Sequence, residues 1–318
     1  MHRNRKFVLL MIVILLGAGM LTGCGSAGTE SSGNTPEATT AETKLTENPS
    51  VSYLGPEGTY TEEAVKAFFS DGQFNPKGTV PEAIGDIAEG KADYAVIPQE
   101  NTLGGAVTNY IDALIAEENI YVVGEVILPI NQTLMALPGA KIEDIRTVYS
   151  HAQGLAQSEK WRKENLPEAE AEEMDSTAAA ASYVAESGDK TIAAIAAPGA
   201  AGLYGLDVLA ENVQITDANK TRFYVLSGSE LKDAEKTQTN AVFVASCEAS
   251  TIDDIIVEIH DSGVELVTIH DRPEGSQLGT YNYIIEVENE SGFSDKLIEK
   301  LSSIPDLHFL GSFNVVEP

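Results

Sequence analysis

Short apolar runs that alternate with helical stretches constrain the fold of this chain more than any other feature of its sequence. From Val51 onward, several β-branched or apolar runs are each followed by a stretch with the composition of a helix. The pairs are VSYLG then TEEAVKAFFS, ADYAVIPQ then AVTNYIDALIAEEN, TVYS then AQGLAQSEKWRKEN, and TIAAIA then PGAAGLYGL. A repeated strand–helix order is typical of α/β domains, so we predict a mainly parallel sheet with helices on its faces.

A polar, charged stretch at residues 227–239 separates this part from a second one. It has the composition of a linker. Beyond it, the predicted elements run strand, helix, strand, strand, helix, strand, which is the βαββαβ order of a ferredoxin-like domain. We therefore expect two domains, residues 51–230 and 238–318, and a chain that is 43% hydrophobic has enough apolar side chains for both cores.

The first residues, MHRNRKFVLLMIVILLGAGMLTGC, combine a basic start, an apolar stretch from Phe7 and small residues before a cysteine. This is the pattern of an export signal, although the apolar stretch alone also fits a membrane span. LTGC resembles the lipobox of bacterial lipoproteins, which implies cleavage after residue 23 and lipidation of Cys24. We expect a signal peptide over 1–23, a flexible linker over 24–50, and anchoring to the outer face of the cytoplasmic membrane.

The chain is strongly acidic, with 20 Lys and Arg against 49 Asp and Glu and a formal net charge of −29. Loss of residues 1–23 removes three cations and no acid, which leaves 17 cations against 49 acids and a charge of −32. Such a chain is a poor partner for nucleic acid or for an anionic membrane surface. We therefore expect it to contact the membrane only through its lipid anchor.

Motifs for metals and common cofactors are missing from the sequence. The five histidines show no metal-ligand spacing, and lipidation of Cys24 leaves Cys247 without a disulfide partner. The sequence contains no G-x-S-x-G elbow, no P-loop and no G-x-G-x-x-G fingerprint. We predict no metal and no cofactor.

Small polar clusters stand between several predicted strands and the helices that follow: GPEGTYTEE, QENTLGGA, YSHAQG and DSTAAAA. Ser, Thr and Asn at such places are N-caps, and each cluster alone needs no other explanation. At the carboxyl edge of one sheet, however, they would aim unpaired N–H groups into a common crevice that suits a small anion. A dianion also needs a cation, and Arg222 in ANKTRFYVL is either that cation or an ordinary structural arginine.

Five ordered segments resemble those of prephenate dehydratases and the related arogenate dehydratases, over about residues 51–318. They are YLGPEGTYTEEA, ADYAVIPQENTLGGAV, VYSHAQGLAQ, DSTAAAA and ANKTRFYVL. The resemblance implies a two-lobed catalytic domain, rather like a periplasmic binding protein, followed by a ferredoxin-like ACT domain. It also implies that the small dicarboxylate prephenate is converted to phenylpyruvate by loss of carbon dioxide and the ring hydroxyl, without a cofactor.

By this resemblance Thr221 is the catalytic residue, whose hydroxyl helps the ring oxygen to leave. The alternative is that Thr221 is simply a β-branched residue at the start of a strand. The resemblance assigns substrate binding to Arg222, Phe223, Glu100, Asn101, Thr102, Thr59, Ser150, His151, Gln153, Ser176 and Thr177. N-capping is the competing interpretation for the residues in the polar clusters. The sequence departs from the family at Gln99, where an apolar residue is usual.

The second domain resembles the regulatory domain of the family less closely. HDRPEGSQLGTYNYIIEVE keeps four candidate regulatory residues, Arg272, Pro273, Leu278 and Gly279, but begins with His270. The resemblance implies phenylalanine as an effector, whereas the family's P-G-A-L motif is missing from CEASTIDDII. The alternative is a domain kept for pairing, and we expect a homo-oligomer, either a dimer or a tetramer.

The predicted export leaves a second class of function open. A solute-binding lipoprotein, or a sensor for an aromatic or carboxylate ligand, would also combine a lipobox with a two-lobed cleft. The complete T-R-F and E-N-T segments favour an enzyme, because capture of a ligand needs no donor to a leaving group. From the sequence we therefore expect an exported, lipid-anchored prephenate dehydratase, with its preference between prephenate and arogenate undecided.

Overall fold

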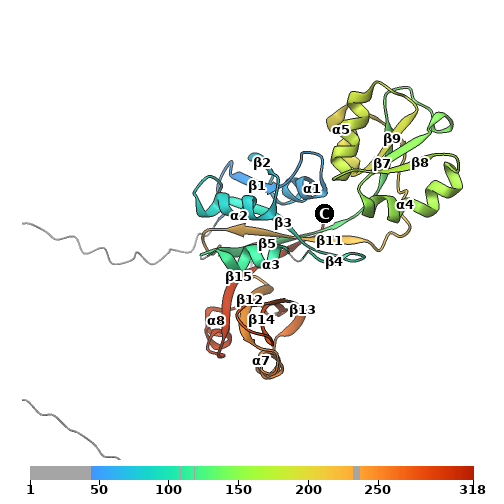
Figure 1. Cartoon of the computed structure of the whole chain (residues 1–318). Coiled ribbons are helices and arrows are strands. Elements are labelled where there is room, and N and C mark those ends of the chain that lie inside the picture. The colour runs from blue at the N-terminus through green and yellow to red at the C-terminus, as the bar shows by residue number, and fades with distance from the viewer. Residues whose placement is uncertain (1–43, 108, 118, 232–236) are drawn as a thin grey trace, which may run out of the picture. The chain divides into compact units, whose positions relative to one another are not determined.

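The computed structural model describes residues 44–107, 109–117, 119–231 and 237–318 (Figure 1). All described residues belong to one compact unit. The predicted signal peptide, the predicted lipidation site Cys24 and residues 24–43 of the predicted linker lie outside the described residues. Within the described part, no helix is both long enough and apolar enough to span a bilayer.

The first lobe is built on a seven-stranded sheet with the order β16-β5-β11-β3-β1-β2 and with β4 paired to β3. Its strands are β1 (Ser50–Leu54), β2 (Gln73–Lys77), β3 (Tyr94–Asn101), β4 (Gly105–Ala106), β5 (Tyr121–Pro129), β11 (Lys220–Ser227) and β16 (Val315–Val316). β1 is parallel to β2 and β3, whereas β11 is antiparallel to its neighbours β3 and β5. A strand that comes late in the sequence therefore lies between two strands that come early.

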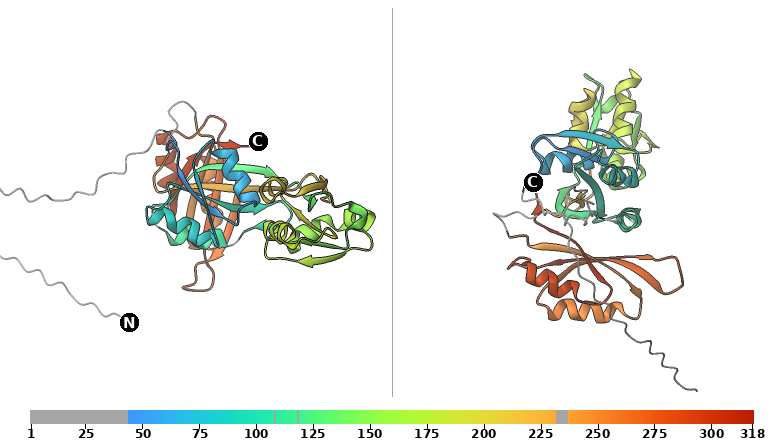
Figure 2. Two further views of the ribbon diagram at one scale, coloured as in Figure 1. Left: turned by 90° about the horizontal axis from the view of Figure 1, so that it is seen from above. Right: turned by 90° about the vertical axis from the view of Figure 1, so that its left-hand side faces the viewer.

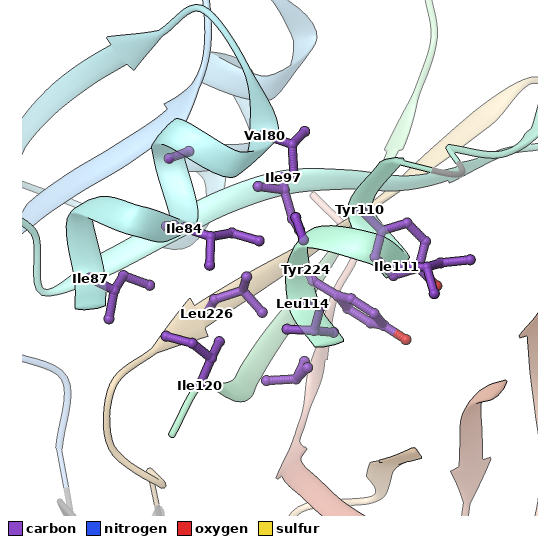
Figure 3. Packing of buried hydrophobic residues seen from close by; sticks show 14 of the residues in the cluster. Val80, Ile84, Ile87, Ile97, Tyr110, Ile111, Leu114, Ile120, Tyr224 and Leu226 are labelled. Carbon is purple, nitrogen blue, oxygen red and sulfur yellow. The ribbon is translucent and has the colours of Figure 1, made fainter. Parts of the chain in front are cut away.

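Three described helices pack against this sheet: α1 (Tyr60–Phe68), α2 (Val80–Ala88) and α3 (Asn109–Ala116). α1 and α2 begin at Thr59 and Thr79, whose hydroxyls accept hydrogen bonds from backbone N–H groups of the first turn. Apolar side chains of α2, α3 and β11, including Ile84, Leu114 and Tyr224, form one buried cluster (Figure 3). Burial of each such side chain contributes about 1.5–3 kcal/mol, so this cluster fixes α2 and α3 against β11.

The second lobe is built on a five-stranded sheet with the order β10-β6-β9-β7-β8. Its strands are β6 (Thr133–Ala136), β7 (Thr147–Ser150), β8 (Glu170–Glu173), β9 (Ile192–Ala196) and β10 (Asp207–Ala210). Its helices are α4 (Ala152–Asn165), α5 (Thr177–Ser187), α6 (Pro198–Tyr204) and the short 3₁₀ turn η1 (Ile142–Asp144). Alanines of α5 and β9 meet in its core, and their small side chains let the helix approach the sheet closely.

The chain passes between the two lobes twice, through residues 130–132 and 211–219. Backbone hydrogen bonds join the two passages: Ile130 N donates to Asn219 O, and Val213 N donates to Gln132 O, both at 2.9 Å. The lobes therefore share a short double connection. A cleft beside such a junction is a common place for a ligand site.

The C-terminal domain, residues 240–313, has the element order βαββαβ and an antiparallel sheet of order β13-β14-β12-β15. Its elements are β12 (Asn240–Glu248), α7 (Ile252–Asp261), β13 (Glu265–Pro273), β14 (Thr280–Glu288), α8 (Asp295–Ser302) and β15 (Leu307–Phe313). Both helices lie on the same face of the sheet (Figure 2). Their apolar sides pack against Phe243 and Ile285 in a separate core cluster.

The end of the chain holds two strands, where the βαββαβ order expected from the sequence has a single last strand. β15 ends at Phe313, and the short β16 that follows pairs with β5 of the first sheet in parallel. Gly311, with a φ of 141°, allows β15 to pass close to β5, since a Cβ there would lie 2.1 Å from the carbonyl oxygen of Val122. The C-terminal part of the chain thus supplies a strand to the first lobe.

Two other sequence expectations need correction. The sheets are mixed and not mainly parallel, because β11, β6 and β10 run against their neighbours. The alternating pattern also misses β2 and α2, which lie over QFNPK and VPEAIGDIA. β2 is a partly exposed edge strand that contains a proline and has no fully buried residue, so it carries no apolar alternation to detect.

Candidate active site

A cavity of about 550 Å³ lies where β11, the passages between the lobes and the starts of several helices meet. Its lining combines apolar surface with many uncharged polar side chains. Eight residues predicted from the sequence contribute to the lining: Thr59, Asn101, His151, Gln153, Ser176, Thr177, Thr221 and Phe223. They come from both lobes, so the fold brings together segments that lie far apart in the sequence.

Strand β11 presents alternate side chains to the cavity. Thr221 and Phe223 line it, whereas Arg222 and Tyr224 are absent from its described lining. Successive side chains of a strand point to opposite faces, which explains this division. The sequence T-R-F-Y therefore places a hydroxyl and an aromatic ring in the cavity and a guanidinium behind it.

Asn101 orients the hydroxyl of Thr221. Its Nδ2 donates to Thr221 Oγ1 at 2.8 Å and to Asn219 Oδ1 at 2.9 Å. Since Oγ1 accepts this bond, the hydroxyl proton points away from Asn101. Among the described residues, Thr221 Oγ1 has no acceptor for that proton. Thr221 is therefore set up to donate to a group inside the cavity.

The other end of Asn101 reaches the second lobe. Its Oδ1 accepts a hydrogen bond from Nε2 of Gln153 on α4, at 3.2 Å. A second contact between the lobes joins Oε1 of Glu63 to the backbone N–H of Gly199, at 3.0 Å. The chain of contacts from Gln153 through Asn101 to Thr221 thus depends on the two lobes being close together.

Helices α1, α4 and α5 begin at the cavity. Thr59, His151 and Ser176 are their N-cap residues, and each accepts a hydrogen bond from a backbone N–H of the first turn. The capping and the cavity-lining interpretations of these residues therefore both hold. Helix starts carry unpaired N–H groups and the positive end of the helix dipole, which favours an anion in this space.

The described lining of the cavity offers no fixed positive side chain. Among the described residues that line it, none is Lys or Arg, and Asp175 adds a carboxylate. An anionic ligand would therefore depend on backbone N–H groups, hydroxyls and amides for its binding.

Arg222 occupies a different place from the one that the sequence suggests. Its Nη2 donates to Glu125 at 2.9 Å and to Glu286 at 2.6 Å, and both of these carboxylates are fully buried. Nε lies 2.6 Å from Glu125 Oε1 without the alignment of a hydrogen bond, so that attraction is Coulombic. The prediction that Arg222 binds a substrate carboxylate needs correction, because strand alternation turns it away from the cavity.

Comparison with known proteins places the chain in a family. The family model described as prephenate dehydratase matches residues 51–230. A prephenate dehydratase of Lactococcus lactis subsp. cremoris is 32% identical over 276 residues, which cover 83% of this chain and 97% of that one. A prephenate dehydratase of Amycolatopsis methanolica is 34% identical over 270 residues, 83% of this chain and 88% of that one.

A solved structure agrees with these sequences. The crystal structure of prephenate dehydratase from Arthrobacter aurescens in complex with L-Phe superimposes with a TM-score of 0.75 and 31% identity, covering 83% of this chain and 89% of that one. The chain belongs to the prephenate dehydratase family. It is accordingly an enzyme of the lyase class.

Besides Arg222, three residues that match motifs of the prephenate dehydratase family lie outside the described cavity lining: Glu100, Thr102 and Ser150. Glu100 approaches Arg222, with 3.8 Å between Oε2 and Nη1. The Thr102 hydroxyl accepts from the backbone N–H of Lys220 and donates to its carbonyl oxygen, both at 3.1 Å. The buried Ser150 hydroxyl donates to a strand carbonyl in β9 at 2.6 Å. All three support the residues around the cavity.

Sequence reasoning missed five polar residues of the lining: Tyr60, Thr61, Gln132, Gln157 and Asp175. Gln157 follows Gln153 by four residues on α4, so helical spacing would have indicated it. Gln132 lies in a passage between the lobes, where no periodic pattern exists, and its amide donates to Gln157 at 3.1 Å. Tyr60 and Asp175 are neighbours of the predicted caps.

The segment that resembles the family's regulatory motif lies at the end of β13 and in the loop after it. Arg272 forms two hydrogen bonds with Asp112 of α3, at 2.8 and 2.5 Å. Pro273 ends β13, and in the loop beyond it Leu278 is fully exposed while Gly279 has a φ of 93°. This segment therefore touches the first lobe through Arg272.

His270, the first residue of the segment, is buried beside the first lobe. Its Nδ1 is 2.7 Å from the hydroxyl of Tyr110. Burial lowers the pKa of His270, although the nearby Glu100 carboxylate opposes this. His270, which differs from the residue usual in the family, thus forms a contact between the C-terminal domain and the first lobe.

Proposed function

We propose that this chain converts prephenate to phenylpyruvate, carbon dioxide and water. The main observation in support is the position of the Thr221 hydroxyl, which lines the cavity. Its oxygen accepts a hydrogen bond from Asn101, and among the described residues no acceptor binds its proton. The family is the one in which this activity occurs, since the curated relatives are named prephenate dehydratases. The two-lobed arrangement, similar to a periplasmic binding protein, surrounds the substrate on this view.

The reaction needs the ring hydroxyl to leave while the bond between the ring and its carboxylate breaks. The ring carboxylate leaves as carbon dioxide, and the electron pair of the broken C–C bond enters the ring. The ring C–O bond breaks at the same time, and Thr221 donates its proton to the departing oxygen so that water leaves. A threonine alcohol is a weak acid, but an oriented hydroxyl that meets charge developing in the transition state contributes roughly 2.7–4 kcal/mol. Solvent then returns the proton to Thr221.

The substrate is a dianion, and the described lining of the cavity offers it neutral hydrogen-bond donors and no positive side chain. Helix starts at Thr59, His151 and Ser176 supply N–H donors, while the described lining has no Lys or Arg. A cation beside the carboxylate would stabilise the substrate as well as the transition state. Neutral donors hold the carboxylate less firmly, which favours its loss as an uncharged gas.

The test is turnover by the purified chain lacking residues 1–24. Absorbance of phenylpyruvate should appear when prephenate is added, without any metal or cofactor. Binding of prephenate with no product would overturn the proposal and favour a solute-binding protein or sensor. Arogenate in a parallel reaction establishes which of the two substrates is preferred.

We further propose that the enzyme works outside the cytoplasm, lipid-anchored through Cys24 to the outer face of the cytoplasmic membrane. Support comes from the basic start, the apolar stretch and LTGC in the first residues of the sequence. Labelled fatty acid should be incorporated into the wild-type chain and not into Cys24→Ala. Equal labelling of both chains, or retention of residues 1–23 in the mature protein, would rule out this location.

The C-terminal domain is proposed to be an ACT-like regulatory or pairing domain. Its βαββαβ order and the residues Arg272, Pro273, Leu278 and Gly279 support this, and the Arthrobacter relative was solved with L-Phe. L-Phe should lower the rate of the purified chain if the domain is regulatory, and sedimentation should show a dimer or tetramer if it pairs. A monomer insensitive to L-Phe would contradict both roles.

A further inference from the structure

A buried group of charged side chains lies behind the catalytic strand, on the face of β11 opposite the cavity. Arg222 of β11 contacts Glu125 of β5 and Glu286 of β14, and therefore carboxylates from two domains. Glu286 is fully buried in the C-terminal domain, whereas Arg222 retains 16% of its side-chain exposure. The positive side chain that is missing from the described cavity lining, Arg222, thus lies on the opposite face of the strand.

Glu286 binds two residues on the far face of β11, which is the face opposite the cavity: Arg222 and Tyr224. Its Oε1 accepts from Arg222 at 2.6 Å, and its Oε2 accepts from the hydroxyl of Tyr224 at 2.8 Å (Figure 3 shows Tyr224 in the adjoining core). Asn240 of β12 donates to the same carboxylate at 3.3 Å. A buried carboxylate with this many donors is well satisfied, so it holds both side chains in one arrangement.

The backbone ladder is interrupted where these contacts are made. The pairing of β11 with β3 shifts register between Arg222 and Phe223, because β3 carries one extra residue, Gln99, at this point, whereas β11 stays in continuous register with β5 from Lys220 to Val225. A bulge re-aims the neighbouring side chains and weakens local pairing. Beside residue 222 the ladder of β11 is thus continuous on the β5 side only, so side-chain contacts behind the strand add to what holds residue 221 toward the cavity.

We propose that Glu286 of the C-terminal domain is a positioning residue for Thr221, acting through Arg222 and Tyr224 on the far face of β11. This inference rests on the proposed function, because it assigns Thr221 the role of proton donor. It makes the C-terminal domain a structural part of the active site, whether or not that domain binds an effector.

The first test compares Glu286→Gln with Glu288→Gln in the purified chain. Both changes remove one carboxylate from β14, but Glu288 is exposed and has no described contact with Arg222. Glu286→Gln should lower kcat about 10- to 100-fold with KM within about threefold of wild type, because a displacement of about 1 Å of a reacting group has this effect. Glu288→Gln should match wild type. A wild-type kcat for folded Glu286→Gln would overturn the inference.

A second measurement separates positioning from a general loss of structure. In the Thr221→Val background the donor is already missing, so adding Glu286→Gln should leave the residual kcat within about twofold. An independent further loss of the same size in this background would show that Glu286 does not act through Thr221. If Glu286→Gln does not accumulate in folded form, Glu286→Asp takes its place, with an expected fall in kcat of about 3- to 10-fold. A wild-type kcat for Glu286→Asp would then overturn the inference.

A third measurement does not require turnover. Amide hydrogen exchange of the peptide covering residues 219–226 should be at least about tenfold faster in Glu286→Gln than in Glu288→Gln, because the far face of β11 is released. Equal exchange in the two variants would overturn the inference. Absence of turnover by the wild-type chain would instead count against the proposed function, and the exchange result would still decide whether Glu286 holds the strand.

Discussion

The two faces of β11 carry opposite kinds of chemistry. The cavity face presents Thr221 and Phe223 to a space whose described lining contains no Lys or Arg. The far face presents Arg222 and Tyr224 to the buried carboxylates of Glu125 and Glu286. Thr221, a neutral donor, and Arg222, which belongs to a group of buried charges, are therefore neighbours in sequence but lie on opposite faces of one strand.

This difference shows how an acidic protein can handle an acidic substrate. A guanidinium in the cavity would hold the substrate dianion tightly, including the carboxylate that must leave. Behind the strand, the same guanidinium neutralises buried carboxylates and fixes the strand instead. The N–H groups at helix starts remain to attract the anion, since they are partial charges that need no counterion.

Loss of the Thr221 hydroxyl should have the largest effect. Thr221→Val keeps the side-chain shape and should lower kcat about 10²- to 10³-fold with little change in KM, because one positioned donor to the transition state is removed. Phenylpyruvate formation measures this, and Thr221→Ser is the control that keeps a hydroxyl. Full turnover by Thr221→Val would show that the Thr221 hydroxyl on the cavity face of β11 takes no part in the reaction.

Loss of the Asn101 amide should have a smaller effect on the same face. Asn101→Ala frees the Thr221 hydroxyl to rotate and breaks the contact with Gln153, so kcat should fall about 10- to 30-fold. Asn75→Ala on the edge strand β2 is the matched control and should behave as wild type. Equal rates for the two variants would show that the orientation of Thr221 is set elsewhere.

The far face should make stability depend on pH. Burial, reinforced by the nearby Glu286 carboxylate, raises the pKa of Glu125 to about 7. The folded chain therefore keeps a proton that the unfolded chain has already lost, and the free energy of unfolding should fall as pH rises from about 4.5 toward 7. Glu125→Gln should reduce this decline by about 1–3 kcal/mol.

Urea unfolding of wild type and Glu125→Gln at pH 5 and pH 8 measures that decline. Glu143→Gln, at an exposed glutamate in η1, is the control. Parallel pH profiles for wild type and Glu125→Gln would show that Glu125 is ionised at both pH values.

The smallest effect is expected at Gln99, where the family commonly has an apolar residue. Its Nε2 donates to Tyr224 at 2.6 Å, but its buried Oε1 has no described partner. Gln99→Leu removes this bond, a long second one from Nε2 to Glu286 Oε2 at 3.5 Å, and one unsatisfied oxygen together, so the free energy of unfolding should change by less than about 1 kcal/mol. Chemical denaturation checks this, and a larger loss would mean that Gln99 is an essential member of the far-face group.

Much of the fold and part of the site could be predicted from local sequence. The helix over residues 152–165 lies where AQGLAQSEKWRKEN indicates, because its start follows a short strand and a polar cap. Thr59, His151 and Ser176 could be found as caps for the same local reason. Gln132 could not, since it lies in an irregular passage between the lobes and its partner Gln157 is 25 residues away.

The sequence by itself determined most of the strands and helices, where several helices begin, and that a hydroxyl and a guanidinium stand next to each other at Thr221 and Arg222. These properties depend on neighbours a few residues apart. Tertiary structure alone decided which of the two faces the cavity, and that Glu286, 64 residues away, holds Arg222 on the other side. Strand alternation and long-range pairing set such directions, and both depend on the assembled sheet.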